Sequence, residues 1–158
     1  MEAYASFYSE NRGRVLAYLL RLTGSYPLAS DLVQESFTRY LARYGRKVAN
    51  RSLLFTIARN AALDAVRKSR EDAIHGEPAA PRSGDPEHRL MEKQALDRVT
   101  AAIQRLEPVD RELIALLATE AFSYREIAKL LDITEANVKV KVHRARLRLR
   151  TLLKDGDL

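Results

Sequence analysis

The chain has 158 residues, no cysteine and a formal net charge of +6. Without cysteine it has neither disulfides nor thiolate metal sites, and no apolar run approaches the roughly 20 residues that span a bilayer. The first residues lack the basic-then-apolar pattern of a signal peptide, so we expect none. The positive charge indicates a polyanionic partner.

The charge is unevenly distributed along the chain. Residues 1–70 carry twelve Lys and Arg against five Asp and Glu, whereas residues 71–86 carry one against four. Residues 87–133 carry seven against nine, and residues 134–158 carry seven against three. Two basic segments therefore lie at opposite ends of the chain, with an acidic middle between them.

Apolar residues at helical spacing predict three helices in the first segment and no strand. They cover about 4–23, 25–44 and 52–70, with Gly24 suited to end the first helix and Pro27 to open the second. The side chains expected inside are Tyr8, Val15, Leu19, Leu22, Ala29, Val33, Phe37, Tyr40, Tyr44, Leu54, Ile57, Ala58, Ala61 and Ala65.

The outer face of the second helix carries two acids, Asp31 and Glu35, one turn apart. They could be paired catalytic acids, but on an exposed helix such residues more often form a solvated or partner-binding surface. A short basic loop, residues 44–51 (YGRKVANR), follows this helix.

Residues 71–86 break the helical pattern and hold three of the five prolines and two of the six glycines. This composition predicts a flexible acidic linker. It divides the chain into domains at 1–70 and 87–158. The second domain should begin with helices over about 87–106 and 108–119, the first facing inward with Ala95, Val99, Ala102 and Leu106.

The end of the chain has the pattern of a helix-turn-helix. Ser123 and Glu126 form a capping box, Asp132 suits a left-handed helix end, and Thr134 can cap the last helix. The inward stripe of that helix is Val138, Val142, Ala145, Leu149 and Leu152. The opposite face is rich in Lys and Arg, which predicts a helix that enters a DNA major groove; the alternative is that the charge only solvates an amphipathic helix.

We find no active site in the sequence, and expect a non-enzymatic binding protein without metal or cofactor. His75, His88 and His143 are too scattered for a metal site, and neither a Walker-type phosphate loop nor a dinucleotide fingerprint is present.

Five segments, in order, resemble the signatures of extracytoplasmic-function (ECF) sigma factors, the minimal two-domain type of the sigma-70 family. They are Ala29–Phe37, Ile57–Arg67, Leu106–Arg111, Tyr124–Ala128 and Val142–Arg146, and the resemblance covers nearly the whole chain. The chain departs from the family pattern at Leu53, where Trp is usual, at Asp132, where Gly is usual, and at 136–141, where the family has G-T-V-K-S-R.

The resemblance implies an all-α protein with a three-helix sigma region 2 and a helix-turn-helix sigma region 4 joined by the linker. It implies a bacterial, cytoplasmic sigma factor that binds core RNA polymerase and directs it to the −10 and −35 elements of promoter double-stranded DNA. The implied polymerase-binding residues are Asp31, Leu32, Gln34, Glu35 and Thr38. Those implied for the −10 element are Arg46, Lys47, Asn50, Arg59, Asn60 and Arg67. Those for the −35 element are Arg125, Ala136, Asn137, Lys139, Val140, Lys141, His143, Arg144 and Arg146.

Two rival functions remain at this point: an operator-binding repressor or activator, and a polymerase-binding antagonist without DNA selectivity. We also expect an anti-sigma factor to restrain the free protein, because Leu63, Val140 and Leu147 are apolar residues on outward faces. The alternative is that the two domains pack on each other through these faces.

Overall fold

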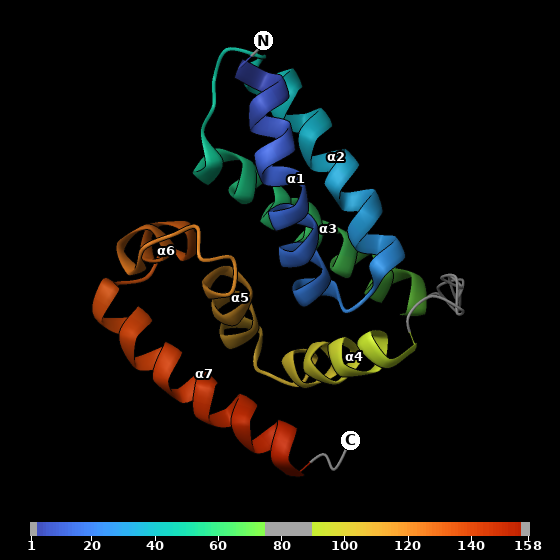
Figure 1. Cartoon of the computed structure of the whole chain (residues 1–158), viewed down its shortest axis with the longest axis vertical. Helices are drawn as coiled ribbons and strands as arrows, with labels where there is room; N and C mark the ends of the chain where they lie inside the picture. Colours follow the sequence, from blue (N-terminus) through green and yellow to red (C-terminus); the bar gives the residue numbers. More distant parts are fainter. Residues whose placement is uncertain (1–2, 75–89, 156–158) are drawn as a thin grey trace.

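The computed structural model describes the backbone of residues 3–74 and 90–155, and the side chains of residues 3–72 and 97–154. Within these ranges the chain forms seven helices and no strand (Figure 1), which confirms the predicted all-α fold class. The helices are α1 Ala3–Thr23, α2 Tyr26–Tyr44, α3 Arg51–Ile74, α4 Leu90–Gln104, α5 Pro108–Leu117, α6 Tyr124–Leu131 and α7 Glu135–Asp155. No helix of this described part is long and apolar enough to cross a membrane.

Helices α1, α2 and α3 pack against one another as an N-terminal unit. Local signals set their ends: Gly24 has a φ of 72° after α1, and the Ser25 hydroxyl accepts a hydrogen bond from the Leu28 amide at the start of α2. The predicted interior is confirmed, with Tyr8, Tyr44 and Ala65 only partly buried. Aromatic rings fill much of it, since Phe7 stacks on Tyr40 with 5.2 Å between ring centroids.

The end of α3 and the exposure of Val99 differ from the sequence prediction. Helix α3 continues through the first four residues of the predicted linker, because 71–74 contains neither proline nor glycine and Gly76 comes only later. The rest of that linker, 75–86, lies outside the described residues. Val99 was expected inside but is 40% exposed; the buried face of α4 carries Thr100, Ala102 and Ile103 instead.

Helices α4 to α7 form a C-terminal unit in which hydrogen bonds fix each turn. Arg111 closes the end of α4, because its Nη2 donates to the carbonyl oxygens of Gln104 at 2.8 Å and Leu106 at 3.3 Å. The predicted capping box at Ser123 is present, and Asp132 ends α6 in the left-handed conformation, with φ 56° and ψ 47°. The Thr134 hydroxyl accepts a hydrogen bond from the backbone N–H of Asn137 at 3.1 Å, so it caps α7 as predicted.

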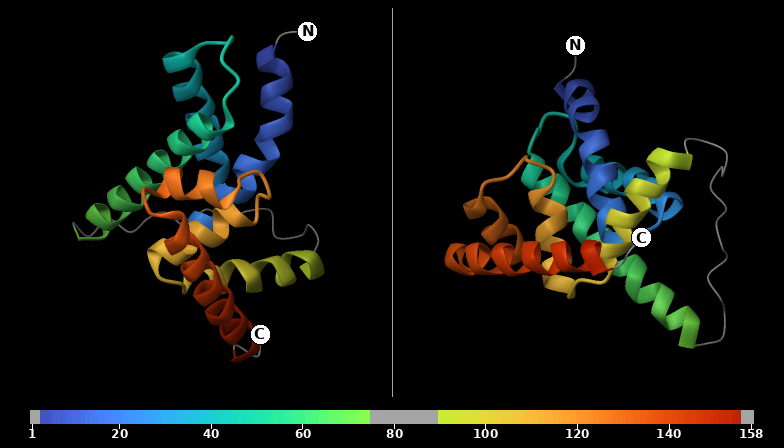
Figure 2. Two further views of the ribbon diagram at one scale, coloured as in Figure 1. Left: turned by 90° about the vertical axis from the view of Figure 1, so that its left-hand side faces the viewer. Right: turned by 60° about the horizontal axis from the view of Figure 1, so that its bottom comes forward.

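The two units pack on each other. Helix α1 contacts α4 and α5, and α3 contacts α6 (Figure 2). One hydrophobic cluster runs through both units, from Val15 and Phe55 to Leu113 and Ile127. The domains therefore do meet, as the alternative reading allowed, but through other faces: Leu63, Val140 and Leu147 remain 45%, 49% and 46% exposed.

The capping box makes α6 sensitive to acid. The backbone N–H of Ser123 donates to the Glu126 carboxylate at 2.8 Å, and this bond lowers the pKa of Glu126 below its ordinary value of 4.5. The stabilisation is therefore complete above about pH 4.5 and is lost as pH falls through the lower folded-state pKa. We expect Glu126→Gln to melt with less dependence on pH than wild type in this acid range, as measured by circular dichroism. If wild type and Glu126→Gln were equally sensitive to acid, other carboxylates would govern the acid transition.

Ser123→Ala removes the other half of the capping box and should lower the free energy of unfolding by about 1 kcal/mol at neutral pH.

Candidate nucleic-acid interfaces

The outward face of α7 is mostly polar and basic, with Val140 and Leu147 as exposed apolar residues. Its inward stripe, led by Val138, Val142 and Ala145, is buried, which turns the opposite side to solvent. Of the residues predicted to meet the −35 element, Lys141 is half-buried and the others are exposed: Ala136, Asn137, Lys139, Val140, His143, Arg144, Arg146 and, on α6, Arg125. The structure thus brings this predicted group together on one helix-turn-helix, in which α6 packs against α7.

The outward face of α2 carries the predicted polymerase-binding residues. Asp31, Gln34, Glu35 and Thr38 are all exposed. Leu32 is only 6% exposed and belongs to the hydrophobic core, so it does not share this exposed face. The helical spacing of Leu32 relative to Ala29 and Ser36, which are also buried, was the available signal.

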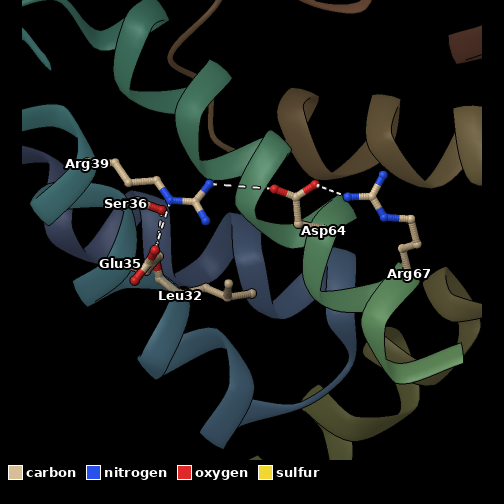
Figure 3. A network of polar contacts seen from close by, with 6 residues as sticks. All are labelled: Leu32, Glu35, Ser36, Arg39, Asp64 and Arg67. Carbon is tan, nitrogen blue, oxygen red and sulfur yellow. Dashed lines mark hydrogen bonds and ion pairs between the residues drawn. The ribbon is translucent and has the colours of Figure 1, made fainter. Parts of the chain in front are cut away.

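A chain of ion pairs crosses from this face to α3 (Figure 3). The Arg39 guanidinium lies 2.9 Å from the Glu35 carboxylate on α2 and 3.7 Å from the Asp64 carboxylate on α3, and Asp64 also pairs with Arg67 at 2.9 Å. These side chains are between 42% and 71% exposed, so each pair adds little stability. Together they link the exposed face of α2 to α3.

The loop at 45–50 is held by a buried tyrosine. The Tyr40 hydroxyl donates to the Val48 carbonyl oxygen and accepts from the backbone N–H of Asn50 at 3.1 Å. The Asn50 side chain in turn accepts from the Leu53 amide at 3.1 Å, which caps α3. Arg46 and Lys47 are exposed at the tip of the loop, and the Arg46 guanidinium lies 5.9 Å from the Tyr4 ring centroid.

The three predicted −10 residues on α3 do not share one environment. Asn60 is exposed, and Arg67 is exposed while paired with Asp64. Arg59 instead turns to the C-terminal unit, where its Nε and Nη2 donate to the two carboxylate oxygens of Glu112 at 2.6 and 3.3 Å. In this arrangement Arg59 has its charge matched within the chain.

A cavity of about 630 Å³ opens beside the loop, and sequence reasoning did not find it. Its lining combines Phe7 and Asn11 of α1 and Asn50 of the loop with Phe122 and Glu126, which come from the C-terminal unit. No local pattern predicts this arrangement, because the two parts of the lining are at least 70 residues apart in the sequence.

Comparison with known proteins identifies the family of the chain. The family model described as sigma-70 region 2 matches residues 7–71, and the model described as sigma-70, region 4 matches residues 96–149. The RNA polymerase sigma factor CarQ of Myxococcus xanthus is 33% identical over 168 aligned positions, covering 99% of this chain and 92% of CarQ. The ECF RNA polymerase sigma factor SigM of Bacillus subtilis is 32% identical, covering 90% of each chain.

Two solved structures share the fold. The sigma factor RpoE of Bartonella quintana, bound to the anti-sigma factor NepR, superposes with a TM-score of 0.74 at 25% identity and 96% coverage of both chains. CnrH, bound to the cytosolic domain of CnrY, superposes with a TM-score of 0.72 at 23% identity, with 99% of this chain and 90% of CnrH covered. Family models for both regions, together with relatives matched from end to end, show that the chain belongs to the ECF sigma factors of the sigma-70 family, the subunits that direct RNA polymerase to promoters.

Proposed function

We propose that this sigma factor docks on core RNA polymerase through the exposed face of α2 and reads promoter DNA at two places. Helix α7 contacts the −35 element, and the loop at 45–50 with the exposed face of α3 contacts the −10 element. The observation that carries this proposal is the separation of three surfaces on one chain: an acidic patch on α2, a basic loop and a basic recognition helix, each exposed. Two weak DNA contacts on one molecule become selective together through effective concentration.

Run-off transcription with purified core polymerase tests this function directly. The chain should start transcripts at defined sites from a template that carries its promoter, whereas core polymerase alone should not. A plain repressor or a polymerase antagonist would yield no such transcripts. A sigma factor of this kind acts in the bacterial cytoplasm, where the polymerase and the chromosome are.

An anti-sigma partner also belongs to the proposed function. Leu63, Val140 and Leu147 stay about half exposed after the two units have packed, so the chain's own fold does not cover them. Exposed apolar residues surrounded by charge are typical of interaction surfaces. The solved sigma factor RpoE was captured with the anti-sigma factor NepR, which supports the same role here.

Charge reversal on α2 should abolish polymerase binding without unfolding the protein. Asp31→Lys with Glu35→Lys changes two exposed acids, and the Glu35–Arg39 pair that it breaks is a surface pair of small energetic value. We expect no co-elution with core polymerase, while the circular dichroism spectrum and melting stay near wild type. The matched control is Asp97→Lys with Glu107→Lys, which makes the same charge change at exposed acids of the C-terminal unit. Equal loss of binding in both doubles would contradict a specific α2 interface.

The loop at 45–50 should act during promoter opening. Replacing Arg46 and Lys47 by Ala leaves the Tyr40 anchor intact, so the loop keeps its path while its charge is lost. We expect open-complex formation, followed by permanganate reactivity of unpaired thymines, to fall more than closed-complex binding. A basic loop beside an aromatic ring can hold a flipped base, and each stacked base contributes about 1–3 kcal/mol. Equal losses in both steps would limit the loop to phosphate contact.

Asn137 should specify a base on the recognition helix. Its side chain is exposed in the first turn of α7, and an amide pairs well with adenine in the major groove. Asn137→Ala should cost about 1–3 kcal/mol of binding and relax the preference at one position, as measured by selection from a randomised −35 element. Arg146→Ala and Arg148→Ala provide the comparison, because the loss of a phosphate contact weakens binding to all sequences alike. Unchanged base preferences in Asn137→Ala would show that the assigned register is wrong.

A further inference from the structure

The loop at 45–50 forms neither helix nor strand, yet a side chain from the core reaches its backbone. Tyr40 of α2 is fully buried, and its ring packs on the rings of Phe7 and Tyr44 with 5.2 Å and 5.4 Å between centroids. These contacts restrict the ring, so the packing of α1 against α2 sets the position of the Tyr40 hydroxyl. Removal of the hydroxyl alone would leave this ring packing in place.

The Tyr40 hydroxyl satisfies two backbone groups of the loop at once. It donates a hydrogen bond to the Val48 carbonyl oxygen and accepts one from the backbone N–H of Asn50 at 3.1 Å. Backbone groups in a loop lack the partners that a helix or a sheet supplies, and here one side chain provides both an acceptor and a donor. The two bonds lie on either side of Ala49, so they fix the course of the backbone there.

Asn50 carries the connection on to α3. Its side-chain Oδ1 accepts from the backbone N–H of Leu53 at 3.1 Å, and its carbonyl oxygen accepts from the backbone N–H of Leu54 at 3.2 Å. These two bonds make Asn50 the N-cap of α3. Asn50 was expected to contact the −10 element, but its side-chain acceptor is occupied by the helix.

The hydrogen bonds determine which way the loop presents its side chains. The Val48 carbonyl points inward to Tyr40, while the Val48 side chain is 38% exposed and follows the exposed Arg46 and Lys47. At the other end of the loop, the backbone N–H of Gly45 donates to the Leu41 carbonyl oxygen at 2.9 Å. The loop is therefore held at both ends before any ligand binds. A loop ordered in advance loses less conformational entropy on binding.

We propose that Tyr40 and Asn50 are positioning residues for promoter opening. Tyr40 acts through the loop backbone and Asn50 through the start of α3, and together they hold the loop in the conformation that receives the single-stranded −10 element. This assigns Asn50 a capping role in place of a base contact. The proposal rests on the proposed function in assigning the loop to the −10 element.

The free protein tests the effect of the Tyr40 hydroxyl on the loop. Tyr40→Phe removes the hydroxyl and keeps the ring. Tyr18→Phe is the matched control, because Tyr18 is also fully buried in the N-terminal unit and its hydroxyl has no hydrogen-bond partner in the described part of the chain. Limited trypsin digestion followed by mass spectrometry measures cleavage after Arg46 and Lys47. We expect cleavage there to be about threefold to tenfold faster in Tyr40→Phe, as for the loss of one net hydrogen bond, and unchanged in Tyr18→Phe.

Promoter opening tests the functional consequence with the full chain and core polymerase. In Tyr40→Phe the rate of open-complex formation, followed by permanganate reactivity of unpaired thymines, should fall about threefold to tenfold, because a smaller fraction of loops is competent. Binding of core polymerase and closed-complex affinity should stay at the wild-type level, as should every step in Tyr18→Phe. A purely structural role for Tyr40 would instead lower all steps together.

Asn50 provides an independent pair of variants, which also serves if Tyr40→Phe does not fold. Serine is as good an N-cap as asparagine, whereas alanine is a poor one. Asn50→Ser should therefore open promoters at the wild-type rate, and Asn50→Ala should be slower. Equal defects in both variants would contradict the capping role and return Asn50 to direct base contact.

The remaining outcomes separate this proposal from the proposed function. If the Arg46→Ala and Lys47→Ala double variant loses promoter opening while Tyr40→Phe keeps it, the positioning role of Tyr40 fails and the assignment of the loop to the −10 element stands. If both keep it, the assignment of the loop fails and the proposal falls with it. Equal defects in Tyr40→Phe and Tyr18→Phe would also overturn the proposal, because the effect would then come from the core as a whole.

Discussion

The Arg59–Glu112 ion pair is the interaction on which the arrangement of this molecule depends. It connects α3 to α5 across 53 residues of sequence, with both side chains mostly withdrawn from solvent. A lone charge of either sign in this position would be costly, so the pair penalises any partial separation of the two units. The surrounding Tyr18, Phe55 and Phe122 rings also stabilise the contact between the units through apolar burial. One hydrophobic cluster therefore runs through both units, and a second, smaller one lies within the C-terminal unit.

This contact divides the functional surfaces into two groups. The α2 face and the outward side of α7 lie away from it and have the same exposure whether or not the units are in contact. Arg59, Arg51 and the cavity at the loop lie within it or beside it, so they are the groups whose availability changes. The ion pairs of Figure 3 fall in the first group, because Arg39 ties α2 to α3 inside the N-terminal unit and does not involve α5 or α6. The exposed face of α2 is thus built independently of the contact between the two units.

Features set by neighbouring residues could be predicted from the sequence, and features set by distant residues could not. Ser123 with Glu126, Asp132 and Thr134 follow from backbone groups within a few positions, and the structure places each as predicted. The apolar stripe of α7 likewise needs only helical periodicity. Val99 was misplaced because its packing partners, and not helical spacing alone, decide its exposure. Leu32 falls on the same stripe as Ala29 and Ser36, so its burial could be read from helical spacing. Glu112 and Phe122 carry no local mark of their roles: a Glu in an amphipathic helix and a Phe before a helix cap are ordinary until Arg59 and Phe55 are brought against them.

The exposure of the α2 face also constrains what could separate the two units. A ligand shifts a conformational equilibrium only by the difference between its affinities for the two states. Because Asp31, Gln34, Glu35 and Thr38 are already exposed while the two units are in contact, a partner that touched this face alone would bind the joined and the separated units equally. Separation of the two units therefore requires contacts that only one of the two arrangements can make.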